Sequence, residues 1–181
     1  MMKKKRNQIR ALTRMALCAA VLCACSYVVI PLPISPAVVS LHTVAVNLTG
    51  LILEPGQAFA TVGLYLLMGL VGLPVFSGGT AGPGKLFGPA GGYYFGFLLS
   101  AWAISIFKGK KPDSVRYAMV TTLVGVPLEH ICAVGMMCIH NGFQVIPAFV
   151  TISLPFLLGD IMKCLVSAVC GAAVCRALDR K

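Results

Sequence analysis

The sequence predicts an all-α membrane protein, a bundle of six transmembrane helices with its N- and C-termini in the cytoplasm. Three observations lead to this prediction. Hydrophobic residues make up 58% of the 181-residue chain and charged residues 11%, with a mean hydropathy of +0.89, whereas a soluble domain has about 25% charged residues. Apolar segments long enough to cross a bilayer recur along the chain. Basic residues gather on one set of connections between these segments.

The six apolar segments follow one another with a polar, proline-rich or glycine-rich break between each pair. We expect helices at residues 11–30, 38–53, 57–75, 88–107, 114–138 and 149–176. The breaks are 31–36 (PLPISP), 54–56 (EPG), 78–92, 108–112 and 140–147. Segment 38–53 is short beside the ~20 residues of a typical span, so we expect it to be tilted, kinked or partly buried by neighbours. The chain 1–181 is then a single membrane domain, with a basic cytoplasmic segment at 1–10 and the bundle at 11–176.

The distribution of basic residues predicts the orientation. With six spans and a cytoplasmic N-terminus, 13 of the 15 Lys and Arg residues fall inside. They are Lys3, Lys4, Lys5, Arg6, Arg10, Arg14, Lys108, Lys110, Lys111, Arg116, Arg176, Arg180 and Lys181. The outer connections contain Lys85 alone, and Lys163 lies within the last apolar segment. This asymmetry is the one that the positive-inside rule describes.

The first apolar segment also has a second interpretation. A basic start followed by an apolar run is typical of a signal peptide, and Leu22-Cys23-Ala24-Cys25 resembles a lipoprotein cleavage box. Cleavage there would leave five spans in an almost wholly apolar chain.

Composition argues against several other classes. The net charge of +10 does not indicate nucleic-acid binding, because the basic residues form no face interleaved with aromatic side chains. The eight cysteines lie in apolar segments without a C-x-x-C pair, and no histidine stands at ligand spacing from two of them. Buried thiols behave as small apolar side chains, so we assign no metal site. We find no nucleophile–base pair or metal set at membrane depth, and therefore predict no catalytic residue and no enzyme.

The glycine-rich stretch is close to a phosphate-binding motif without being one. Gly79 to Lys85 reads G-x-x-x-x-G-K, the start of a P-loop, but Leu86 stands where that motif requires Ser or Thr. The stretch follows a predicted membrane helix rather than a buried strand, and Pro83 lacks one of the N–H groups that would hold phosphate. It also falls on the outer side, so it is not a nucleotide site.

Three ionisable residues lie in apolar segments, namely Glu129, Asp160 and Lys163. Charges at membrane depth cost about 2.5–3.5 kcal/mol each and usually serve function. Asp160 and Lys163 are three residues apart and share one helix face. They are either an internal salt bridge or part of a ligand site, which Pro155 and Gly159 would open near the outer end of the helix. Glu129 follows Pro127 and is expected to be structural.

Ala16, Ala20 and Ala24 repeat at every fourth position of the first apolar segment. Small residues at this spacing let another helix approach closely. The spacing alone does not decide whether that helix belongs to the same bundle or to a partner.

Four stretches resemble the BioY family, the biotin-specific S components of energy-coupling factor (ECF) transporters. They are IPLPISPAVVSLHT (30–43), GLVGLPVFSGGTAG (69–82), GKLFGPAGGYYFGF (84–97) and PFLLGDIMK (155–163). The resemblance extends over nearly the whole chain after residue 10. The glycine-rich motif and the G-D-x-x-K ending together are specific to the family, whereas either alone is not.

The resemblance implies a six-helix bundle in a bacterial cell membrane that binds biotin near its outer face and needs no cofactor. It implies that Asp160 and Lys163 contact biotin and that Lys85 is the basic residue of the glycine-rich loop. Ala16, Ala20 and Ala24 match the alanine motif that docks onto a membrane-embedded coupling protein, which two cytoplasmic ATPases drive.

The chemistry of biotin agrees with these residues. Asp160 is an acceptor for the two ureido N–H groups, and Lys163 and Lys85 are donors for the carboxylate. The glycine backbone at Gly78 and Gly79 allows close approach, and Tyr93 and Tyr94 supply aromatic surface. Two positions depart from the family, since His42 stands where Gln is expected and Ala90 where Thr is expected. The alternative function is an S component or solitary carrier for another small carboxylate-bearing nutrient.

Overall fold

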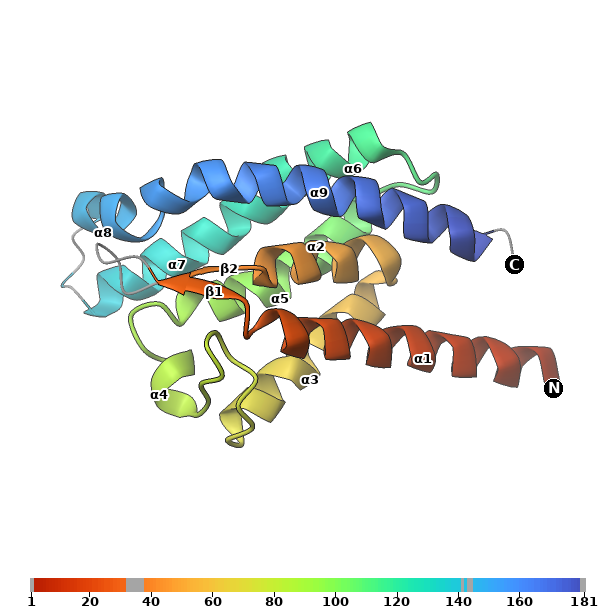
Figure 1. Cartoon of the computed structure of the whole chain (residues 1–181), viewed down its shortest axis with the longest axis horizontal. Helices are drawn as coiled ribbons and strands as arrows, with labels where there is room; N and C mark the ends of the chain where they lie inside the picture. Colours follow the sequence, from red (N-terminus) through yellow and green to blue (C-terminus); the bar gives the residue numbers. More distant parts are fainter. Residues whose placement is uncertain (1, 32–37, 141, 143–144, 180–181) are drawn as a thin grey trace.

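The structure, a computed structural model, describes residues 2–31, 38–140, 142 and 145–179. The described chain is helical apart from one short β-hairpin (Figure 1). Its main helices are α1 (Met2–Cys25), α2 (His42–Ile52), α3 (Pro55–Leu70), α5 (Gly92–Phe107), α6 (Ser114–Val120), η1 (Thr121–Gly125), α7 (Val126–His140) and α9 (Leu154–Asp179). Two shorter helices are α4 (Pro83–Leu86) and α8 (Val145–Ile152), and the hairpin pairs β1 (Val29–Pro31) with β2 (Val38–Ser40).

The prediction for the first two segments was wrong at their adjoining ends. A helix was expected through residue 30, but α1 ends at Cys25 and β1 pairs antiparallel with β2, Val29 opposite Ser40. The second helix was expected from residue 38, but α2 begins at His42. Both ends contain β-branched pairs, which favour strands, and a short apolar run does not distinguish a strand from a helix by periodicity. The helix α1 begins at Met2, so residues 2–10, predicted as a separate basic segment, are part of this helix.

The last two predicted segments, 114–138 and 149–176, differ from the helices in the structure. Residues 114–140 form one continuous rod in which η1 is a π-helical turn between α6 and α7. Segment 149–176 is divided at Ser153 into α8 and α9. Pro155 occupies the first turn of α9, where its missing N–H leaves no hydrogen bond unmade.

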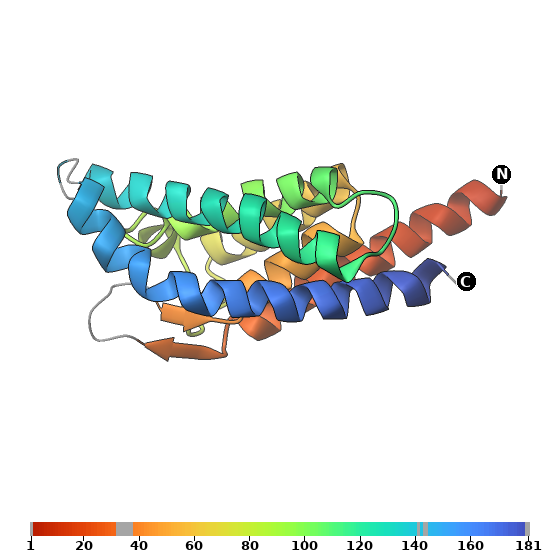
Figure 2. The same cartoon turned by 90° about the horizontal axis from the view of Figure 1, so that it is seen from above.

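Within the described residues each predicted segment contains an apolar helix, but α3 ends at Leu70 rather than at residue 75, and α5 begins at Gly92 rather than at residue 88. Among the described residues, three helices are long and apolar enough to cross a membrane, Lys5–Cys25, Ser114–His140 and Leu154–Leu178. The shorter apolar helices are α2, α3 and α5. The two termini lie at the same end of the bundle in both views (Figures 1 and 2). The hairpin, α4 and α8 lie at the opposite end.

The helix α5 occupies the middle of the bundle, packed against α2, α3 and α7. Its glycines allow the close contact with α7. A Cβ on Gly96 would lie 2.7 Å from Glu129 Cα, and one on Gly92 would overlap the Cys132 carbonyl. Since only glycine permits this approach, the face of α5 that carries Tyr93 lies directly beside α7.

The helix α1 is part of this bundle, because it packs on α2 and α3 and buries Leu22 completely. This packing favours its interpretation as a membrane span over that of a cleavable signal peptide.

Candidate functional site

A pocket opens at the end of the bundle that carries the hairpin and α4, opposite the termini. It encloses about 510 Å³ of space between atoms, a figure that includes its open mouth. Its lining residues come from the hairpin, α2, the loop 71–91, α5 and α9. They are Ser40, Thr43, Ser77, Lys85, Ala90, Tyr93, Tyr94, Phe97, Phe156, Asp160 and Lys163.

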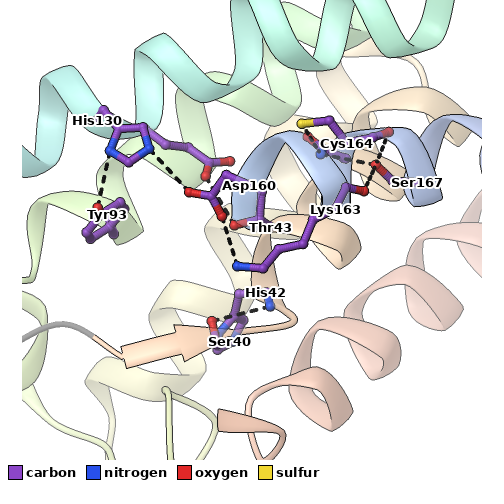
Figure 3. Close-up of polar contacts among 11 residues, drawn as sticks. Ser40, His42, Thr43, Tyr93, His130, Asp160, Lys163, Cys164 and Ser167 are labelled. Atoms are coloured by element: carbon purple, nitrogen blue, oxygen red, sulfur yellow. Dashed lines mark hydrogen bonds and ion pairs between the residues drawn. The ribbon is translucent and has the colours of Figure 1, made fainter. Parts of the chain in front are cut away.

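The buried charges of the pocket form a connected network (Figure 3). Lys163 Nζ donates to Asp160 Oδ1 at 2.8 Å, and His130 Nε2 lies 3.2 Å from Asp160 Oδ2. The other ring nitrogen of His130 lies 3.2 Å from the Tyr93 hydroxyl. Asp160 is only 3% exposed, so these partners offset the cost of burying its carboxylate. Helices α7 and α9 therefore meet at this carboxylate, and α5 joins them through His130.

A second polar layer begins at Thr43, which lines the pocket, and continues into the bundle. Glu129 is 1% exposed and accepts a long hydrogen bond, 3.4 Å, from the Thr43 hydroxyl to its Oε2. One turn further along α2, Asn47 donates to Ser167 Oγ at 3.2 Å. The polar groups of α2 thus face those of α7 and α9 inside the bundle, where lipid cannot reach them.

The loop 71–91 contributes Ser77 and Lys85 to the polar lining. Ser77 N–H donates to the Tyr94 hydroxyl at 3.1 Å, and Tyr94 donates in turn to Ser77 Oγ at 3.3 Å. Phe76, in the same loop, is fully buried and packs against the Tyr94 ring. These contacts hold the part of the loop around Ser77 against the bundle, so the Ser77 hydroxyl reaches the pocket in a defined place.

Four predicted ligand residues, Asp160, Lys163, Lys85 and Tyr93, come together in this pocket. The sequence placed them on three separate segments, and the fold joins them. The sequence left open whether Asp160 and Lys163 form an internal salt bridge or part of a ligand site. In the structure they form the ion pair and also line the pocket.

Gly78 and Gly79 are not among the described residues that line the pocket. Both have positive φ, 76° and 70°, a conformation that glycine adopts without strain. Gly78 N–H donates to the Ser26 carbonyl at 2.8 Å. The two glycines therefore shape the loop that presents Ser77.

Ala16, Ala20 and Ala24 lie outside this site, on α1. All three are exposed and share one face of the helix at i, i+4 spacing. This face of α1 is therefore not buried within the bundle.

Sequence reasoning missed several lining residues and His130. Ser40, Thr43, Ser77, Phe97 and Phe156 are residue types that occur throughout apolar helices and loops, so no pattern singled them out. His130 lies 30 positions before Asp160 on another helix. Its adjacency to Glu129 was the only signal, and it indicated no partner.

Known proteins are similar to this chain over nearly its full length. The family model described as the BioY family matches residues 1–180. The chain is 33% identical to the biotin transporter BioY2 of Lactococcus lactis subsp. cremoris over 180 residues, which are 96% of this chain and 94% of that protein. It is 30% identical to the biotin transporter BioY of Thermotoga maritima over 141 residues, which are 77% of this chain and 82% of that protein.

A solved structure has the same fold. The crystal structure of the S-component for biotin from an ECF-type ABC transporter matches with a TM-score of 0.86, covering 93% of this chain and 92% of that chain at 22% identity. The match of the family model and the identity to these relatives lead to one conclusion: the chain belongs to the BioY family.

Proposed function

We propose that this protein binds biotin at the outer face of a bacterial cell membrane and is the substrate-capture S component of an energy-coupling factor transporter. The observation that carries the proposal is the pocket with the Asp160–Lys163 pair, in a chain similar over most of its length to biotin transporters. A pocket with mixed apolar and aromatic walls and a few convergent polar groups is the general form of a small-molecule site.

The pocket offers a partner for each part of biotin. The Asp160 carboxylate accepts hydrogen bonds from the ureido N–H groups, because an ionised carboxylate has about four acceptor sites and its two described partners leave some of them open. Lys163 and Lys85 neutralise the ligand carboxylate. Tyr93, Phe97 and Phe156 pack against the apolar ring and chain.

Uptake against a gradient requires an energy source that the described pocket does not supply. We propose that the bundle crosses the membrane six times with cytoplasmic termini and docks through Ala16, Ala20 and Ala24 onto a membrane-embedded coupling protein. Two cytoplasmic ATPase subunits then drive that coupling protein. The exposure of the three alanines on one face of α1 supports the docking surface. No cofactor takes part in the proposal.

A competition assay on the purified protein tests the ligand. Isothermal titration with biotin gives the affinity, and the titration is repeated in excess lipoate or pantothenate. Both competitors carry a carboxylate but lack the ureido ring, so we expect biotin binding to persist unchanged. Loss of biotin binding in the presence of either competitor, or no heat of biotin binding, would assign the pocket to a different carboxylate-bearing nutrient.

A further inference from the structure

His42 lies behind the pocket wall and contacts four of the residues that line it. Its side chain is fully buried at the start of α2. The Nδ1 atom lies 3.3 Å from Ser40 Oγ and 3.2 Å from Ser77 Oγ (Figure 3 shows the Ser40 contact). The imidazole ring stacks on Phe97 at a centroid distance of 5.6 Å and meets the Tyr94 ring edge-on. His42 itself is not a described lining residue.

The hydrogen bonds of Tyr65 determine which ring nitrogen of His42 carries the hydrogen. The Tyr65 hydroxyl donates its single hydrogen to the Val75 carbonyl at 2.9 Å, because a carbonyl oxygen only accepts. At its 2.8 Å contact with His42 Nε2, the tyrosine oxygen must therefore accept. The Nε2 atom of His42 carries the hydrogen, and Nδ1 of the neutral ring is an acceptor with one lone pair. A charged ring is disfavoured because no carboxylate is among its described partners in this fully buried place.

Two pocket hydroxyls thus share one acceptor. Ser40 reaches Nδ1 from the hairpin and Ser77 from the loop 71–91, and a single lone pair makes one well-aligned hydrogen bond. Ser77 Oγ is also held by the hydroxyl hydrogen of Tyr94. When one serine donates to Nδ1, the hydrogen of the other is left to point to an acceptor oxygen in the pocket.

We propose that His42 is a positioning residue that controls ligand affinity from outside the pocket. It holds one of the hydroxyls of Ser40 and Ser77 and directs the other as a hydrogen-bond donor toward an acceptor oxygen of the ligand, the ureido carbonyl or the carboxylate. The same side chain links the hairpin, α3 and the loop 71–91, so these walls keep their spacing before the ligand arrives. The inference rests on the proposed function for the identity of the ligand, and its geometry is independent of it.

The first test is the tautomer of His42 in the wild-type protein without ligand. Histidine-selective ¹⁵N NMR of the purified protein reports the protonation of each ring nitrogen. The chain has three histidines, and the spectrum of His42→Gln identifies the signal that belongs to position 42. We expect a neutral ring with hydrogen on Nε2. A hydrogen on Nδ1, or a charged ring at neutral pH, would overturn the proposal whether or not biotin binds.

The second test is a double-mutant cycle on biotin affinity. His42→Phe keeps the stacking on Phe97 and removes both nitrogens, and we expect biotin to bind about five- to tenfold more weakly, the value of one net hydrogen bond. His42→Gln retains a donor and an acceptor and should stay within about threefold of wild type. Ser77→Ala should weaken binding less in the His42→Phe background than in wild type, because the two side chains act together.

Additive effects of His42→Phe and Ser77→Ala would indicate packing alone and overturn the proposal. Equal loss of affinity in His42→Gln and His42→Phe would do the same. If wild-type protein binds no biotin, the proposed function fails instead, while the tautomer measurement still decides the role of His42.

Discussion

Asp160 is the residue on which the proposed site depends most. Its two oxygens are bound from two different helices, Oδ1 by Lys163 on its own helix and Oδ2 by His130 on α7. A carboxylate bound on both sides keeps a single orientation, which lowers the entropy cost of placing it against a ligand. Its neighbours stabilise its charge, and that charge is what a ligand N–H would bind.

Asp160→Asn removes this charge with almost no change in shape. A hydrogen bond to a charged group contributes about 1.5–3 kcal/mol, so we expect biotin affinity to fall roughly one to two decades. Isothermal titration of the purified variant measures the change. Asp113→Asn is the matched control, because Asp113 caps α6 by accepting from Val115 N–H at 3.1 Å, and asparagine caps a helix equally well. Wild-type affinity in a folded Asp160→Asn variant would leave the ion pair a structural role only.

The contact between α5 and α7 supports the pocket from outside its lining, because it brings Tyr93 to His130, which in turn contacts Asp160. Gly92 and Gly96 bring the backbone of α5 against α7, and this distance sets the reach from Tyr93 to His130. The pocket geometry is therefore sensitive to side chains that never touch the ligand.

Gly96→Ala should destabilise the bundle. The new methyl group would meet the backbone of Glu129 at 2.7 Å, and forced expansion of a packed contact typically costs about 1–3 kcal/mol. Thermal unfolding of the purified variant should show a lower midpoint and weaker biotin binding. Gly135→Ala on α7 is the control, since a Cβ there meets no atom within 4 Å. Equal midpoints for the two variants would show that the helices separate at little cost.

The exposed alanine face of α1 is expected to act in assembly rather than in binding. Ala20→Trp places a large side chain on this face, which blocks close approach of a partner helix, while none of the three alanines is among the residues that line the pocket. We expect the isolated variant to bind biotin normally, yet fail to co-purify with a coupling protein and ATPase subunits or to support uptake. Ala173→Trp, on an exposed position of α9, controls for a bulky residue facing lipid.

Loss of biotin binding in the isolated Ala20→Trp variant would contradict this assignment. It would mean that the alanine face supports the bundle itself, and the partner surface would then lie elsewhere.

The two ends of the bundle differ in how many basic residues they carry. The two termini, the turn between α2 and α3, and the connection from α5 to α6 lie at one end, and the loop that carries Lys85 lies at the other (Figures 1 and 2). Within the described residues, the terminal segments and the connection from α5 to α6 contain 11 of the 15 basic residues of the chain. This is the distribution that the positive-inside rule associates with a cytoplasmic end.

Lys85→Cys and Lys110→Cys test this orientation in intact cells. A membrane-impermeant thiol reagent should label the first variant above the background of the native cysteines and leave the second at that background. Labelling of position 110 from outside, without labelling of position 85, would reverse the orientation and move the pocket to the cytoplasmic face.

Hydropathy and local spacing were enough to predict the membrane class, the six apolar segments and the Asp160–Lys163 pair. These features depend on properties of neighbouring residues, which the chain displays without folding. The β-hairpin was missed because its apolar strands carry the same signal as helix ends. Asp160 meets His130, and His42 meets Ser77 and Tyr65, through contacts between segments 23 to 35 positions apart. Such contacts arise from the close packing of particular helices, and no local pattern encodes the distance between them.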